Sequence, residues 1–197
     1  MRKTTYNSYP HWRILIFLLL SFSPKQGNLP CNYIDPNKLN WGYYLGRVNP
    51  DVYYTAYTRG RMFYFAHYKV RPEYNLKDPP RVCVAFVSDS SWVNYNKLYG
   101  FSKESQKQLL THEKMHYIVT IIHAKKLKRD IAEFKFKNAN EFLQAFDDYT
   151  KSITEMNRQY DDQTKHGTIP IKQKEWEEKI YEELAKIDHV KLDSEMK

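Results

Sequence analysis

The spacing of apolar residues changes near residue 102, from a period of two to the 3.6-residue period of a helix. Before this point, from residue 39 onward, runs of aromatic and β-branched residues are separated by Gly, Pro and Ser, as is typical of strands. Residues 52–58 and 62–68 flank Arg-Gly-Arg at 59–61 and predict a β-hairpin, and residues 81–87 predict a further strand.

The second half of the chain predicts three helices. Ser102 is a suitable N-cap for a helix that extends to about residue 131, since neither Gly nor Pro interrupts it. Asn138, followed three residues later by Glu141, predicts a capped start for a helix that extends to about residue 164, with Gly167 as its C-terminal cap. Pro170 opens a third helix, whose apolar stripe consists of Trp176, Ile180, Leu184 and Ile187. Strands followed by helices indicate an α+β fold.

The first predicted helix contains the pentapeptide His112-Glu113-Lys114-Met115-His116, which has the form H-E-x-x-H. Residues four apart lie on one face of a helix, so the imidazoles of His112 and His116 can bind one zinc ion. Glu113 is then next to the open side of the metal, where it can take a proton from a zinc-bound water. The alternative is an exposed, charged helix with two solvated histidines.

A catalytic zinc site needs a third protein ligand. His123 lies seven residues beyond His116, which is about 10 Å along an unbroken helix and too far to share the metal. The second helix is expected to fold back along the first, so that residues from about 156 to 162 come opposite the histidines, and the block that ends in His166 begins there. His166 is our first choice, because neutral imidazole is a common zinc ligand.

Several residues of the same segment compete with His166. Asp161 or Asp162 could be the ligand, or could orient a histidine. Tyr160 could donate a hydrogen bond to a developing oxyanion or could simply pack, and Glu155 is a weaker ligand candidate. His166 could also be a histidine favoured by the helix dipole at a helix end.

The N-terminus has the pattern of an export signal. Basic residues precede an apolar run at 14–20, which is too short to span a bilayer, so we expect residues 1–27 to direct export and 28–197 to form one domain. Removing that segment leaves 27 basic and 23 acidic residues, so the net charge falls from +8 to +4 and nucleic-acid binding loses most of its support. In an exported chain Cys31 and Cys83 could form a disulfide, or Cys83 could be a free buried thiol.

Several blocks resemble a family of uncharacterised bacterial secreted proteins that are predicted to be zinc-dependent proteases within the zincin group. The resemblance extends from about residue 33 to 181. It is carried by the H-E-x-x-H motif and by the block Tyr160-Asp161-Asp162-Gln163-Thr164-Lys165-His166-Gly167, with weaker support from the tryptophan-containing stretches 39–41, 91–93 and 173–176. It implies a zincin-like fold with a mostly antiparallel N-terminal sheet, the motif helix and two further helices.

These observations predict an exported zinc metallopeptidase that acts on a peptide or protein substrate, with Glu113 activating the water. The strand at 81–87 is expected to border the cleft and to pair with an extended substrate. Two alternatives stay open: a zinc amidase that acts on cell-wall peptides, and a non-catalytic exported module that contains zinc. We expect no nucleic-acid partner and no stable membrane span.

Overall fold

The computed structural model describes residues 31–49, 51–65 and 79–193. The expected export segment, 1–27, lies outside the described residues. The described part is α+β, as predicted, with two small antiparallel sheets followed by three long helices. Its elements, in chain order, are β1 (Ala56–Tyr57), β2 (Gly60–Phe65), β3 (Arg81–Phe86), β4 (Trp92–Val93), α1 (Tyr95–Leu98), α2 (Lys103–Ala132), α3 (Ala139–Thr164) and α4 (Pro170–Ile187), with short 3-10 helices at Trp41–Tyr43 and Ser88–Ser90.

The two sheets have two strands each. β1 pairs with β4, and β2 pairs with β3 in a register that places Gly60 opposite Phe86 and Phe65 opposite Arg81. The predicted hairpin between 52–58 and 62–68 is therefore wrong, because its two arms belong to different sheets; its residues 66–68 lie outside the described part. The stretch that begins the strand-rich half also differs from expectation, since Trp41–Tyr43 is a 3-10 helix.

Gly60 explains why the Arg-Gly-Arg sequence does not form the expected turn. It is the first residue of β2, where the strand approaches α2 so closely that a Cβ would lie 2.5 Å from Oγ1 of Thr120. Glycine is thus required by close packing between a strand and a helix, which a short sequence pattern cannot distinguish from a turn.

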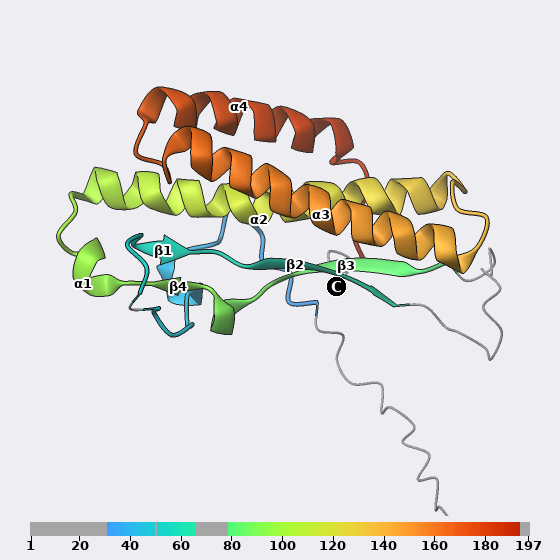
Figure 1. Cartoon of the computed structure of the whole chain (residues 1–197), viewed down its shortest axis with the longest axis horizontal. Coiled ribbons are helices and arrows are strands. Elements are labelled where there is room, and N and C mark those ends of the chain that lie inside the picture. Colours follow the sequence, from blue (N-terminus) through green and yellow to red (C-terminus); the bar gives the residue numbers. More distant parts are fainter. Residues whose placement is uncertain (1–30, 50, 66–78, 194–197) are drawn as a thin grey trace, which may run out of the picture.

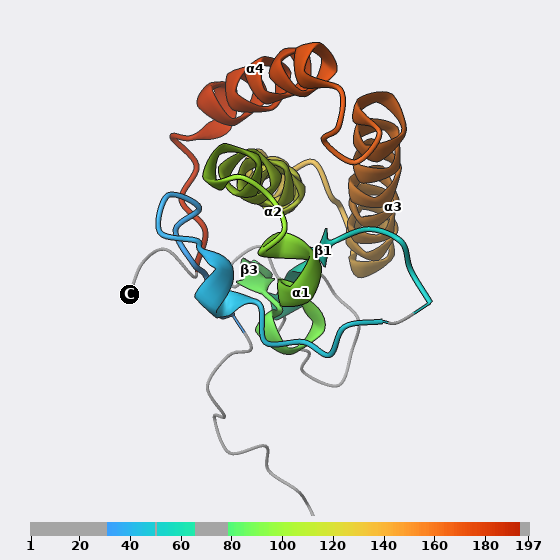
Figure 2. The ribbon, with the colours of Figure 1, turned by 90° about the vertical axis from the view of Figure 1, so that its left-hand side faces the viewer.

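Helix α2 is the central element of the molecule. Ser102 caps it as predicted, its side chain accepting a hydrogen bond from the amide of Ser105. The sheets lie on one side of α2, while α3 and α4 flank its other sides (Figures 1 and 2). Its middle is buried all round, which is typical of a helix enclosed by other elements.

Helices α3 and α4 also begin where the sequence predicts. The Asn138 side chain accepts a hydrogen bond from the backbone amide of Glu141, and Pro170 occupies the first turn of α4. The left-handed end of α3 starts at Lys165, two residues before Gly167, and all three residues from Lys165 to Gly167 have positive φ. The α4 stripe packs as expected: Trp176, Ile180 and Ile187 are buried in one cluster with α2 residues, with Leu184 packed against it.

The N-terminal segment is linked to β3 by a disulfide and a hydrogen bond. Cys31 and Cys83 form a disulfide with a Cα–Cα distance of 5.7 Å, so Cys83 is not a free thiol. The amide of Phe86 also donates to the carbonyl of Asn32. On β3 the backbone of Val82 additionally binds Asp193, which joins the end of the described chain to the same strand. Within the described residues, none of the helices combines the length and apolar composition needed to cross a membrane.

Candidate metal centre

The H-E-x-x-H motif lies in the first half of α2, at the start of the long buried stretch of that helix. His112 and His116 are 1% and 9% exposed, so they are not the solvated histidines of the alternative interpretation. Their Nε2 atoms are 3.3 Å apart, and both rings contact Tyr160 of α3. The helix thus brings two imidazole nitrogens to one point.

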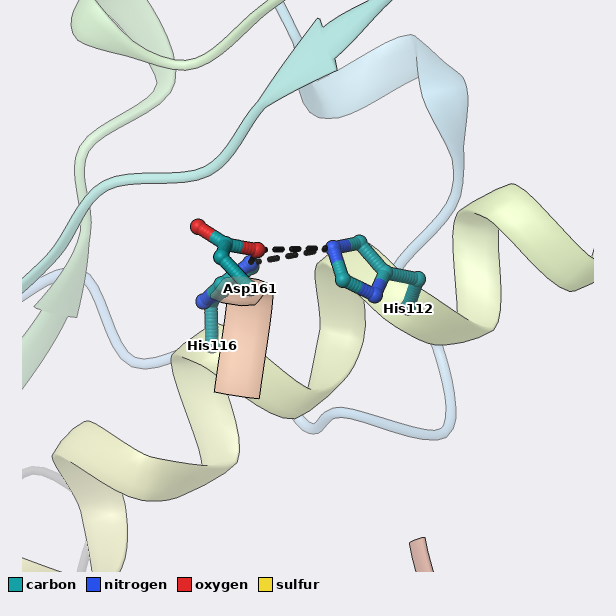
Figure 3. A group of neighbouring side chains, drawn as sticks. All are labelled: His112, His116 and Asp161. Carbon is teal, nitrogen blue, oxygen red and sulfur yellow. Dashed lines mark hydrogen bonds and ion pairs between the residues drawn. The ribbon is translucent and has the colours of Figure 1, made fainter. Parts of the chain in front are cut away.

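Helix α3 adds the carboxylate of Asp161 at that point. Its Oδ1 lies 3.1 Å from Nε2 of His112 and 3.1 Å from Nε2 of His116 (Figure 3). Three ligands bound tetrahedrally at the usual zinc distances would be about 3.3–3.4 Å apart. The three atoms therefore have nearly the separation of a tetrahedral site, and these residues could hold a metal ion.

The other ring nitrogens fix the tautomers of both histidines. Nδ1 of His112 is 3.0 Å from the amide oxygen of Gln173, and Nδ1 of His116 is 3.0 Å from the amide oxygen of Asn157. An amide oxygen can only accept, so each Nδ1 carries the proton and each Nε2 presents a lone pair.

The orientation of the Gln173 amide is itself determined by its neighbours. Its Nε2 donates to the hydroxyl of Tyr160 at 2.6 Å and to Oε1 of Glu177 at 2.7 Å. The amide oxygen is thereby directed at His112. Tyr160 is fully buried, so its hydroxyl supports this amide and does not face the cleft.

Three hydrogen-bond acceptors thus converge on one point, and such an arrangement needs a proton or a cation between them. Burial acts to lower the pKa of His116, but the nearby carboxylate of Asp161 outweighs it and raises that pKa. Burial acts to raise the pKa of Asp161, but the close contacts of its carboxylate with the rings of His112 and His116 prevail and hold that pKa far below its usual range. The centre therefore favours a carboxylate that faces positive charge.

Glu113 lies beside this centre, and one of its carboxylate oxygens has no hydrogen-bond partner among the described residues. The residue is 4% exposed, and that oxygen is Oε2. Glu113 lines a cavity of about 280 Å³ together with His112, His116 and Asp161. A buried carboxylate oxygen without a partner is costly, and such groups are concentrated at functional sites.

His166, our first choice from the sequence, lies next to the three-residue group but outside it. Its side chain is 36% exposed, and its Nδ1 is 3.4 Å from Oδ1 of Asp161. The ring stacks on Tyr54 at 5.5 Å and meets the edge of Tyr53 at 5.8 Å. The left-handed backbone at 165–167 and these two tyrosines place it at the wall of the cavity.

The remaining candidates lie away from the metal position. Asp162 and Glu155 pair with Arg158 on the exposed side of α3. Nδ1 of His123 binds the carbonyl of Val119 within α2, in agreement with the exclusion of His123 on grounds of distance.

The sequence interpretation missed three residues around the centre. Asn157 lies one helical turn before Asp161 on α3, a spacing that could have indicated a residue on the same face. Gln173 lies in the stretch 173–176 next to Trp176, but nothing in its sequence context indicated a role at the site. A Cβ on Gly167 would lie 3.1 Å from the His112 ring, so this glycine allows the chain to pass over that imidazole.

The strands that border the centre are β1 and β2. The cavity beside Glu113 is lined by residues 53–57, and a second depression is lined by residues 57–63. The expected bordering strand, 81–87, contributes nothing to either, because β3 pairs with β2 on the side away from α3.

Comparison of the chain with models of protein families, with curated proteins and with solved structures finds no match.

Proposed function

We propose that the chain is a zinc-dependent peptidase with a zincin-like arrangement of its site. One observation carries the proposal: Nε2 of His112, Nε2 of His116 and Oδ1 of Asp161 converge beside the buried, unpartnered carboxylate oxygen of Glu113. In zinc hydrolases, neutral imidazoles and a carboxylate can bind the metal, and an adjacent glutamate can act as the general base. This centre contains two such imidazoles, one carboxylate and an adjacent glutamate.

The donor set fits zinc in particular. Imidazole nitrogen suits zinc better than it suits Mg²⁺ or Ca²⁺, which prefer oxygen ligands. His112, His116 and Asp161 would hold the ion, in which case Asp161 replaces His166 as the third ligand. A zinc ion bound there would supply Lewis acidity, which acidifies a water and polarises a carbonyl group.

Glu113 would perform the proton transfers. Glu113 lines the cavity, and its carboxylate oxygen without a hydrogen-bond partner among the described residues can accept a proton from the attacking water. The same carboxyl group would then return that proton to the leaving amine, so the carboxylate is regenerated. Burial of Glu113 keeps bulk water from competing for this oxygen.

The geometry around the centre suits an extended chain as substrate. In the described part, β2 pairs with β3 alone, and residues 57–63 line a depression that continues to His116 and Asp161. A strand edge of this kind can bind peptide backbone by hydrogen bonds. This role was expected for the strand at 81–87, and we assign it to β2.

The Cys31–Cys83 disulfide supports the proposal that the protein works outside the cytosol, since such bonds persist mainly in oxidising compartments. It agrees with the export segment expected at 1–27.

The test compares zinc-loaded wild type with Glu113→Gln on a mixture of peptides from a protein digest, followed by mass spectrometry. Glu113→Gln should keep its zinc and its fold but lose about 10²- to 10⁴-fold in cleavage rate, because an amide cannot accept the proton. Glu178→Gln, an exposed glutamate on α4, is the matched control and should cleave like wild type. Zinc binding without cleavage of any peptide by wild type would favour the non-catalytic module instead.

A further inference from the structure

Two depressions of different chemistry meet at the metal centre. The cavity beside Glu113 has a volume of about 280 Å³, and the groove between β2 and α3 has a volume of about 670 Å³. Tyr57, His116 and Asp161 line both. A chain bound across the centre would therefore place one part in the cavity and the next part in the groove.

The cavity offers apolar contacts close to Glu113. Leu109, one turn before Glu113 on α2, lies in its wall together with Phe101 and the tyrosines of the β1 segment. Tyr53, Tyr57 and Phe101 are 77%, 41% and 42% exposed. Large apolar side chains that remain exposed around one cavity mark a surface that binds an apolar group. Lys165 also lines the cavity, so its wall is not wholly apolar.

The groove offers positive charge. Arg59 directly precedes β2 and Arg61 lies within it, so in the alternation of an extended chain both lie opposite Gly60 and Met62, which approach α2. Both arginines line the groove and are exposed, and neither pairs with an acidic side chain of the described residues. Arg158, across the groove on α3, differs because Glu155 and Asp162 already neutralise it.

We propose that the centre binds an extended polypeptide segment that has a large apolar side chain in the cavity and an acidic side chain in the groove. The apolar residue contacts Leu109 and Phe101, and the acidic residue pairs with Arg59 or Arg61. The inference rests on the proposed peptidase function and specifies its substrate class.

The spacing of an extended chain fits this assignment. A strand rises about 3.3 Å per residue, so a few residues carry a segment from the cavity into the groove. Alternate side chains of a strand point the same way, which lets residues two apart meet Arg59 and Arg61, which are themselves two residues apart, just before and within β2. The competing explanation is that the arginines only keep the edge of β2 from pairing with other chains.

The test uses internally quenched peptides that carry one Phe and, about three residues away, one Glu on a neutral background, in both orders. Matched peptides replace Phe by Ala, or Glu by Lys. With zinc-loaded wild type, the Phe→Ala peptide should lose about 10- to 100-fold in kcat/KM, and the Glu→Lys peptide about 2- to 5-fold.

Variants of the protein test whether the cavity causes the preference for Phe and the groove causes the preference for Glu. Phe101→Ala should reduce the discrimination between Phe and Ala, and Arg61→Glu should reverse that between Glu and Lys. The controls are Ile171→Ala, another exposed apolar residue, and Lys174→Gln, another exposed cation, both on α4. Neither control should change a preference.

Binding to the Glu113→Gln variant, measured by fluorescence anisotropy, separates this inference from the proposed function. The same Phe and Glu preferences in binding, without cleavage by wild type, would contradict hydrolysis and support the segment proposed. Binding or cleavage that is indifferent to Phe and Glu would overturn the inference. A loss of solubility in Arg61→Glu with unchanged peptide preference would assign the arginines to edge protection and would also overturn it.

Discussion

Two amide side chains determine which ring nitrogen of His112 and of His116 faces Asp161. Gln173 from α4 and Asn157 from α3 each accept the Nδ1 proton, so the lone pairs at Nε2 face Asp161. Partners of this kind raise the basicity of a metal-ligating histidine and fix its ring. The centre therefore depends on three helices, although its ligands come from only two.

Removing the Gln173 amide should weaken the metal site without removing a ligand. Gln173→Ala leaves Nδ1 of His112 without its acceptor, and zinc affinity should fall about 10- to 100-fold, measured by competition with a chelator of known affinity. Gln159→Ala is the matched control, because Gln159 is a half-buried α3 glutamine whose side-chain amide donates to Glu155. Equal affinities of Gln173→Ala and wild type would show that the amide does not support His112.

The third ligand can be assigned by comparing three alanine substitutions. If Asp161 completes the site, Asp161→Ala should weaken zinc binding about as much as His116→Ala does. His166→Ala should have a smaller effect, since its ring is part-exposed and touches Asp161 at 3.4 Å. The opposite order in a zinc titration would restore His166 as the ligand.

At the scale of elements, α2 and α3 are joined near the far end of α2 by a buried carboxylate. Asp130 accepts hydrogen bonds from Arg129, Lys135 and, at 2.6 Å, from the hydroxyl of Tyr149 on α3. Burial acts to raise the pKa of Asp130, but the hydrogen bonds from Lys135, Tyr149 and Arg129 prevail and lower it.

This network predicts a pH-dependent contribution to stability. Because the pKa of Asp130 is lower in the folded state, its contribution is present above pH of about 4 and is lost as the pH falls through the folded-state value. Asp130→Asn should therefore lower the free energy of unfolding by about 1–3 kcal/mol at pH 7, with a smaller difference near pH 3. Asp147→Asn, an exposed aspartate of α3, should cost less than about 0.5 kcal/mol. A pH-independent difference between Asp130→Asn and wild type in urea titrations would contradict the role of this charge.

The contact of β2 with α2 gives a second element-scale prediction. Gly60→Ala should destabilise the fold by about 1–3 kcal/mol, because the new methyl group would lie 2.5 Å from Oγ1 of Thr120. Thr120→Ala in the same chain should recover part of this loss in a thermal unfolding experiment. Full stability of Gly60→Ala alone would show that β2 can move away from α2.

What could be predicted from the sequence follows from the range of each interaction. Helix starts at Ser102, Asn138 and Pro170 depend on contacts within three or four residues, and all three are confirmed. The hairpin is wrong because strand pairing is a contact between distant segments, and aromatic runs fit either partner. His112 and His116 share one helix and could be placed from their spacing, whereas Asp161 and His166 depend on how α3 ends. That end has three consecutive residues with positive φ, and two of them, Lys165 and His166, are not glycine.

At the scale of the whole molecule, the disulfide joins the N-terminal segment to a strand that packs on α2. Cys31 and Cys83 are 52 residues apart, so the bond restricts a long loop in the unfolded chain. The double variant Cys31→Ala, Cys83→Ala should lose about 2–4 kcal/mol of stability in urea, and added reductant should not lower it further. Its zinc affinity should stay close to that of wild type, since both cysteines lie outside the metal centre. Equal stability of the variant and wild type would show that the disulfide does not stabilise the fold.

The most direct test of the central claim is elemental analysis of the purified wild-type chain. The arrangement of His112, His116 and Asp161 predicts about one zinc per chain, and each of His112→Ala and His116→Ala should lose it while remaining folded by circular dichroism. A folded wild-type chain that contains no zinc, and takes up none when zinc is added, would contradict the account.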